Sequence, residues 1–83
     1  MTIEKWLNKF IDDSKLDREH IFEIENEGEL HFIEFETMVN SILALPAEYQ
    51  KKIKNKLVSI DVHNGDILDY FNYVAEGFTK YAV

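Results

Sequence analysis

The stretch HIFEIENEGELHFIEF, residues 20–35, decides the fold of this chain. Two segments, 20–25 and 30–35, are rich in β-branched and aromatic residues, a composition typical of β-strands. Between them lies Asn26-Glu27-Gly28. A three-residue hairpin loop needs a left-handed residue at its last position, and glycine adopts that conformation without steric cost. The stretch therefore predicts an antiparallel β-hairpin closed by a three-residue loop.

The loop length fixes which residues of the two strands face each other. With a three-residue loop, apolar side chains oppose apolar ones and each histidine opposes a glutamate, pairs that stabilise a sheet by about 0.2–1 kcal/mol each. The alternative is a two-residue loop, which pairs Phe22 with Ile33 but Ile24 with His31, so the three-residue loop is preferred. The predicted pairs are Glu25–Glu29, Ile24–Leu30, Glu23–His31, Phe22–Phe32, Ile21–Ile33 and His20–Glu34.

In the predicted register the two faces of the hairpin differ in character. One face presents the apolar side chains Phe22, Ile24, Leu30 and Phe32 and should cover a layer of helices. The other face is half apolar, with Ile21, Glu23, Glu25, Glu29, His31, Ile33 and Phe35.

Helical periodicity precedes and follows the hairpin. Residues 3–13 carry apolar side chains at i, i+3, i+4, i+7 and i+8, which is typical of an amphipathic helix, and Thr2 stands at the N-cap position. The same spacing predicts helices over 37–45 and 47–57, separated by Pro46. A longer helix is predicted over 67–81, where Asp66 and Asp69 resemble a capping box.

The segment 58–62 alternates apolar and polar residues and is a candidate short third strand. Residues 1–83 thus predict a single α+β domain, in the order helix, hairpin and three helices. The expected core consists of Trp6, Leu7, Phe10, Phe22, Ile24, Phe32, Met38, Ile42, Ile53, Leu57, Phe71, Val74 and Phe78.

Composition excludes several classes of protein. The 83 residues include 16 acidic and 9 basic ones, which gives a net charge of −7. The chain has no cysteine, which excludes a disulfide framework, a thiolate zinc site and a cysteine nucleophile. No apolar run reaches the roughly 18 residues that span a bilayer, and the N-terminus lacks a secretory signal pattern. We therefore expect a soluble protein of the cytoplasm that does not enter a membrane.

The negative charge is concentrated on the hairpin and its flanks. Residues 19–36 hold seven glutamates and no lysine or arginine. Two interpretations stand side by side: a solvated, solubilising face, or a docking surface for a basic partner, which in a sharper form imitates the phosphates of DNA. The candidate docking residues are Glu23, Glu25, Glu27, Glu29 and Glu34.

A second candidate surface is a tyrosine stripe on the last predicted helix. Tyr70, Tyr73 and Tyr81 lie with Gly77 beside the apolar face of that helix. They are either peripheral core residues or a contact with a partner or a second copy, since tyrosine is enriched in interfaces. The sequence leaves a homodimer open.

Other chemistry has little support in the sequence. Lysines at 51, 52, 54 and 56 form a helix face, but one arginine and no interleaved aromatics argue against direct nucleic-acid binding. The histidines His20, His31 and His63 match no metal-binding spacing, so no metal or other cofactor is expected. No serine lies in a nucleophile motif and no glycine-rich phosphate loop is present, so we expect no enzymatic activity and no catalytic residues.

One resemblance rests on residues 53–74, through the pieces Ile-Lys-Asn, Val-x-Ile-Asp and Asn-Gly-Asp. There the chain resembles a group of small uncharacterised proteins carried by phages and integrative elements of low-GC Gram-positive bacteria. The resemblance implies a bacterial cytoplasm and an accessory gene, and no particular activity.

Taken together, the sequence predicts a small, acidic, non-enzymatic accessory protein that acts by protein–protein interaction. The alternatives are an inhibitor that mimics DNA to occupy a DNA-binding protein, and a regulator that responds to a ligand or metal through His–Glu pairs.

Overall fold

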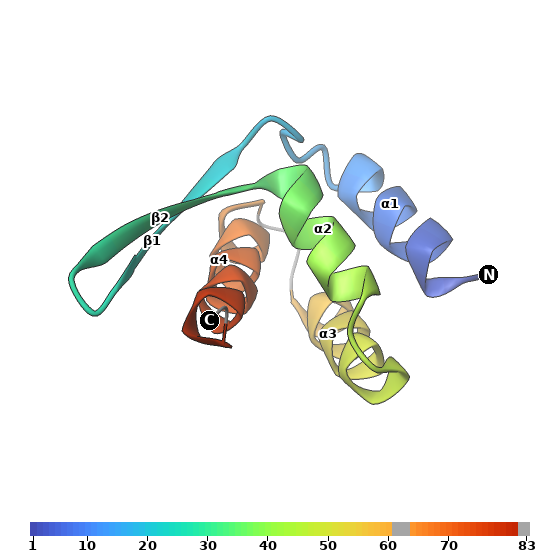
Figure 1. Ribbon diagram of the computed structural model, residues 1–83. Helices are drawn as coiled ribbons and strands as arrows, with labels where there is room; N and C mark the ends of the chain where they lie inside the picture. The colour runs from blue at the N-terminus through green and yellow to red at the C-terminus, as the bar shows by residue number, and fades with distance from the viewer. Residues whose placement is uncertain (61–63, 82–83) are drawn as a thin grey trace.

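The computed structural model describes residues 1–60 and 64–81 and confirms the α+β class. Its elements follow the predicted order of one helix, an antiparallel hairpin and three helices (Figure 1). The elements are α1 (Ile3–Asp13), β1 (Ile21–Asn26), β2 (Glu29–Glu34), α2 (Phe35–Leu43), α3 (Ala47–Ser59) and α4 (Asn64–Tyr81).

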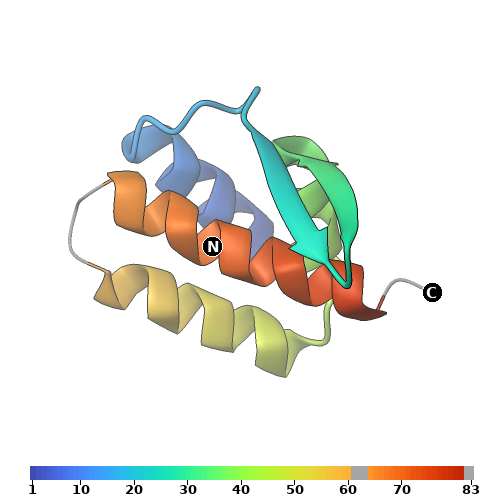
Figure 2. The ribbon, with the colours of Figure 1, turned by 90° about the vertical axis from the view of Figure 1, so that its left-hand side faces the viewer.

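The hairpin crosses α4, and its first strand, β1, packs directly against that helix (Figure 2). All elements except β2 place buried side chains in one cluster, and β2 contributes the partly buried Ile33, so the core is shared by the hairpin and the four helices. The buried residues are Leu7, Ile11, Leu16, Phe22, Ile24, Phe35, Met38, Val39, Ile42, Ile53, Leu57, Ile67, Phe71 and Ala75.

The first helix forms as predicted. Its N-cap is Thr2, whose hydroxyl oxygen accepts a hydrogen bond from the Lys5 backbone N–H at 3.2 Å. Leu7 and Ile11 are fully buried, whereas Trp6 and Phe10 stack on each other at the margin of the core with ring centroids 5.2 Å apart. Trp6 is only partly buried, with the Lys54 ammonium of α3 5.2 Å from its ring centroid.

The hairpin turn differs from the prediction. The loop contains two residues, and both have positive φ angles: 53° at Glu27 and 80° at Gly28. Two consecutive left-handed residues make a type I′ turn, whose twist matches that of the strands it joins. Asn26 therefore faces Glu29 instead of lying in the loop.

This turn shifts the register by one residue from the predicted one. The observed partners are Ile21–Glu34, Phe22–Ile33, Glu23–Phe32, Ile24–His31, Glu25–Leu30 and Asn26–Glu29. A one-residue shift moves every side chain of the shifted strand to the opposite face of the sheet. The predicted pairs were thus wrong, and the disfavoured two-residue loop is the one that forms.

The shift exchanges the residues that β2 contributes to the core. Phe22 and Ile24 of β1 are buried as predicted, but the β2 residue that packs against the core is Ile33. Phe32, predicted to be core, is 61% exposed, and Leu30 is 57% exposed. These two side chains form part of the outer surface of the hairpin.

Aromatic contacts connect the hairpin to two helices. Phe35 begins α2 and does not extend the strand, and its buried ring lies between Phe22 and Phe71. The ring centroids of Phe35 are 5.6 Å from Phe22 and 5.7 Å from Phe71, within the range of favourable aromatic pairs. These contacts join β1, α2 and α4 at the centre of the fold.

The remaining helices confirm most of the predicted pattern. Pro46 is the N-cap of α3 and separates it from α2 as expected. The candidate third strand is wrong at its start, because residues 58–59 belong to α3, while 61 and 62 lie outside the described residues. Since α4 already begins at Asn64, Asp66 lies in its first turn and is not its cap.

The predicted core is largely confirmed. Eight of its thirteen residues are buried, and Trp6, Phe10, Val74 and Phe78 are partly buried against them. Phe32 is the one error. The expected core omitted six further buried residues, five of which lie on the predicted apolar helix stripes: Ile11, Leu16, Phe35, Val39, Ile67 and Ala75, with Leu16 the exception.

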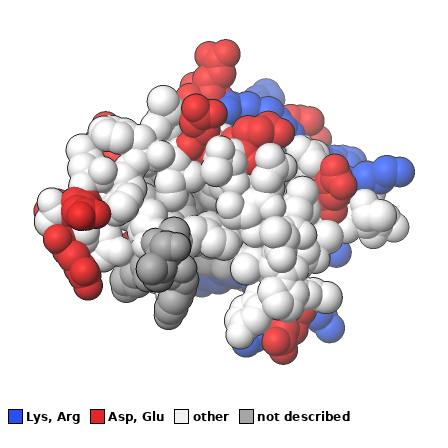
Figure 3. Space-filling view, in the orientation of Figure 1, with Lys and Arg blue, Asp and Glu red and all other residues white. Residues whose placement is uncertain are grey.

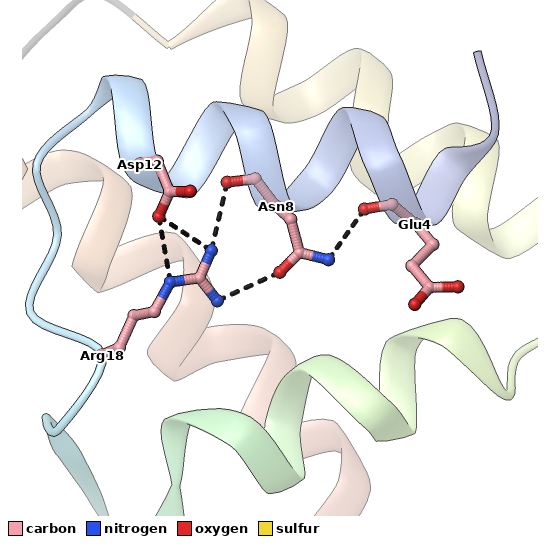
Figure 4. A network of polar contacts seen from close by, with 4 residues as sticks. All are labelled: Glu4, Asn8, Asp12 and Arg18. Carbon is pink, nitrogen blue, oxygen red and sulfur yellow. Dashed lines mark hydrogen bonds and ion pairs between the residues drawn. The ribbon is translucent and has the colours of Figure 1, made fainter.

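The connection between α1 and β1 is held by Arg18, the only arginine of the chain (Figure 4). Its guanidinium donates to the Asp12 carboxylate at 2.9 and 3.0 Å, to the Asn8 side-chain oxygen at 3.0 Å and to the Asn8 backbone carbonyl at 3.1 Å. The Asn8 amide in turn donates to the Glu4 carbonyl at 2.9 Å. The loop is thereby fixed to one side of α1, which sets where the hairpin begins.

The turn geometry predicts opposite effects of alanine at two glycines. Gly28→Ala should lower the free energy of unfolding by about 1–2 kcal/mol, because a side chain disfavours the left-handed conformation. Gly77→Ala in α4 should raise it by about 0.8–1 kcal/mol through helix propensity. Neither added methyl group would meet an atom within 4 Å, so both effects come from the backbone. Urea unfolding of both variants tests this, and a stabilising Gly28→Ala would contradict the observed turn.

Replacement of Arg18 by lysine should lower the free energy of unfolding by about 1 kcal/mol, because an ammonium cannot reproduce the planar set of four hydrogen bonds. The matched control is Lys15→Arg, which changes an exposed side chain of the same loop. Thermal unfolding measures both. Equal stability of Arg18→Lys and the wild type would show that this contact does not hold the loop.

Candidate protein-interaction surface

The outer face of the hairpin combines glutamates with exposed apolar side chains. Directly opposed residues share a face, so the pairs Ile21–Glu34, Glu23–Phe32 and Glu25–Leu30 all project away from the core. Ile21, Leu30 and Phe32 are 52%, 57% and 61% exposed. Each carboxylate lies beside an apolar side chain, and we call these six residues the outer hairpin face.

Three residues of the outer hairpin face are acidic, Glu23, Glu25 and Glu34, and three are apolar, and we call these its acidic half and its apolar half. Glu23 and Glu25 lie on β1, with their Cα atoms about 7 Å apart, as alternate residues of a strand. Leu30 and Phe32 lie next to them on β2. The predicted Glu25–Glu29 pair is absent from this register, so no two of these carboxylates face each other directly.

The structure divides the five candidate glutamates into two groups. Glu23, Glu25 and Glu34 belong to the outer hairpin face. Glu27 lies in the turn, and Glu29 faces Asn26 at the end of the hairpin. All five are exposed, and acidic side chains gather at the end of the hairpin on the face that Figure 3 shows.

The histidines do not form the predicted cross-strand pairs. The Nε2 atom of His31 lies 3.7 Å from the carboxylate of Glu29 on the same strand, and His31 faces Ile24 across the hairpin. The ring of His20 packs edge-on against Phe22 with centroids 4.7 Å apart. Residues 1–60 and 64–81 contain no group of three potential metal ligands, and His63 lies outside them.

The tyrosine stripe is only partly built as predicted. Tyr70 packs against the core, and Tyr73 is 71% exposed and stacks on Tyr70 with centroids 6.3 Å apart. The side chain of Tyr81 lies outside the described part of the chain. Burial, with a smaller contribution from neighbouring Tyr73, raises the pKa of the Tyr70 hydroxyl above its ordinary value of 10.0.

Gly77 lines a shallow apolar groove near this stripe. Its other walls are Leu45, Pro46 and Tyr49, at the corner between α2 and α3, together with Val74 and Phe78 of α4. The groove does not include Tyr70 or Tyr73. For the described tyrosines, the stripe and the groove are therefore adjacent features of α4.

The lysine face of α3 is mostly solvated. Lys51, Lys52 and Lys56 are exposed, and the Lys52 ammonium lies 5.4 Å from the ring centroid of Tyr49. Lys54 is partly buried over Trp6. Both lysine–aromatic contacts lie within about 6 Å, the range of a cation–π interaction, so part of this positive charge serves local packing.

No protein-family model, curated protein or solved structure matches this chain. A proposal about its function therefore rests on its own residues. Among the described helices, none has both the length and the apolar character needed to cross a membrane.

Sequence reasoning missed the apolar half of the outer hairpin face, because the predicted register buried Leu30 and Phe32. Two signals pointed to the observed register. The predicted one set Glu25 against Glu29, a destabilising like-charge pair. It also left the backbone of Asn26 in the loop, although two-residue turns with glycine at the second position are the commonest hairpin connections.

The raised pKa of Tyr70 predicts a loss of stability at high pH. Because folding favours the protonated hydroxyl, this stabilisation is complete below the unfolded pKa of about 10 and is lost as pH rises through the higher folded pKa. Tyr70→Phe should remove this part of the pH dependence, while Tyr73→Phe, at an exposed ring, should retain most of it. Urea unfolding between pH 8 and 11 measures the difference, and identical profiles for the two variants would contradict the assignment.

Proposed function

We propose that this chain is a small, non-enzymatic accessory protein that acts by binding another protein through the outer hairpin face. The observation that supports the proposal is the exposure of Ile21, Leu30 and Phe32, each directly opposite a glutamate on the other strand. Exposed apolar side chains bordered by charge are typical of protein-binding surfaces. The origin in a phage or integrative element stays a prediction from the sequence resemblance.

The two halves of the surface would have different roles in binding. Glu23, Glu25 and Glu34 would accelerate the encounter with a basic partner, since charge complementarity acts mainly on association rates. Phe32 and Leu30 would hold the complex, because buried apolar and aromatic contacts slow dissociation. A basic protein with an exposed apolar patch is the partner that fits both halves.

A DNA-mimic inhibitor is the weaker alternative. Such a protein needs carboxylates that follow one another along an edge as phosphates do. Here Glu23 and Glu25 follow one another on β1, but Phe32 and Leu30 lie directly opposite them and are 61% and 57% exposed, so half of the surface is apolar. The cross-strand His–Glu pairs predicted for a ligand-responsive regulator do not form, and His31 instead lies 3.7 Å from Glu29 on its own strand.

Affinity capture at low and raised salt tests the proposal with paired variants. Phe32→Ser together with Leu30→Ser should abolish capture of the partner at both salt concentrations. Glu23→Lys together with Glu25→Lys should reduce capture most strongly at low salt, where exposed charges are least screened. Mass spectrometry identifies the retained proteins.

The matched control is Glu19→Lys together with Asp69→Lys, which changes the net charge equally at exposed positions outside the surface. It should capture the partner as the wild type does. If the control loses capture to the same degree as the Glu23 and Glu25 variant, only net charge matters and the proposed surface is refuted.

A further inference from the structure

Among the described residues β2 pairs with β1 alone, and its other edge lies above a groove in the protein surface. Residues 31–33 of β2 form one wall, Thr37 and Ser41 of α2 the second, and Phe78 and Thr79 of α4 the third. The groove measures about 390 Å³. Three consecutive residues of one strand line it, so the groove runs beside the backbone of β2 over residues 31–33.

The edge of β2 offers backbone hydrogen-bonding groups to a further strand. In an antiparallel ladder, residues alternate between pairs that exchange hydrogen bonds and pairs that do not. Asn26 and Glu29 close the two-residue turn and are a bonded pair, as are Ile24–His31 and Phe22–Ile33 in this register. The N–H and C=O groups of Leu30 and Phe32 therefore point away from β1, towards the open edge.

The groove beneath this edge suits apolar side chains. Ile33 and Phe78 supply apolar walls. The Ser41 hydroxyl already donates to the Thr37 carbonyl at 2.9 Å, and the Thr79 hydroxyl donates to the Glu76 carbonyl at 2.7 Å. Both of these hydroxyl protons are used within their helices, so the remaining polar side chains of the lining are Thr37 and His31, the latter 3.7 Å from the Glu29 carboxylate.

The negative charge of the hairpin indicates which kind of strand can bind at the edge of β2. A strand added beside β2 would lie next to Glu29 and Glu34, within a segment that has seven glutamates and no basic residue. Pairing the β2 edges of two copies would bring these glutamate-rich strands and two net charges of −7 together, which like-charge repulsion opposes. A basic strand has the complementary charge.

We propose that the β2 edge binds an extended segment of a basic partner protein by strand addition, with alternate apolar side chains in the groove and alternate lysines or arginines on the outer hairpin face. Backbone hydrogen bonds to Leu30 and Phe32 give such binding its affinity, and the groove gives it selectivity. This inference rests on the proposed function and specifies how the partner is held.

The first test uses an acetylated and amidated octapeptide of alternating lysine and valine with the full-length protein. NMR titration should show saturable binding at one site, and hydrogen exchange should slow at the amides of Leu30 and Phe32. Absence of saturable binding, or protection that excludes these two amides, would overturn the proposal.

Two N-methylated forms of the peptide test the backbone contact without altering the protein. A paired strand directs every second amide towards its neighbour. One of the two forms, methylated at the lysine amides or at the valine amides, should therefore bind about tenfold or more weakly. The other form should bind nearly as well as the unmethylated peptide. An equal effect of the two forms would show that the peptide is held by charge alone.

A filled groove provides the protein-side test. Ser41→Tyr places a large side chain in the groove and should weaken peptide binding about tenfold, whereas Asn40→Tyr, at an exposed neighbouring position outside the groove, should not. A partner captured by wild type and by Ser41→Tyr alike, but lost on Phe32→Ser with Leu30→Ser, would reject strand addition and leave the proposed function standing.

Discussion

The left-handed conformation of two consecutive residues, Glu27 and Gly28, is the constraint on which the surface of this protein depends. It closes the hairpin with two residues, and loop length fixes the register of the strands. A loop of three residues would have turned Phe32 inwards and Ile33 outwards. The outer hairpin face, the edge groups of Leu30 and Phe32 and the position of Ile33 above the groove all follow from this turn.

The core explains why this register is compatible with the rest of the fold. With Phe22 opposite Ile33, β2 ends at Glu34 and Phe35 begins α2, where its ring fits between Phe22 and Phe71. The same register removes the repulsion that a Glu25–Glu29 pair would have introduced. Aromatic packing and electrostatics thus favour the same pairing, although the alternation of residue types along the strands favours the other.

The surface that results has two kinds of chemistry at one place. Charge alone identifies the hairpin as unusual, because its glutamates stand without a basic residue between positions 19 and 36. Only exposed apolar side chains beside those glutamates distinguish a binding surface from a solubilising one. The tyrosines of α4 lack that combination in the described residues, since Tyr70 belongs to the core margin and Tyr73 stands alone in its exposure.

The sequence by itself determined the order of the elements and the class of fold, because helical periodicity, Pro46 and the β-rich stretch 20–35 are local signals. Of the thirteen core residues that it predicted, eight are buried. It also located the acidic segment. Only the tertiary structure decided which face of β2 meets the core, because the local signals conflict. The alternation of residue types favours one register, the turn and the Glu25–Glu29 repulsion favour the other, and the packing of Ile33 and Phe35 accompanies the second. It likewise decided that α3 continues through residues 58 and 59, where an alternating pattern indicated a strand. The position of the apolar binding surface was therefore a question of long-range packing, which one strand's sequence does not contain.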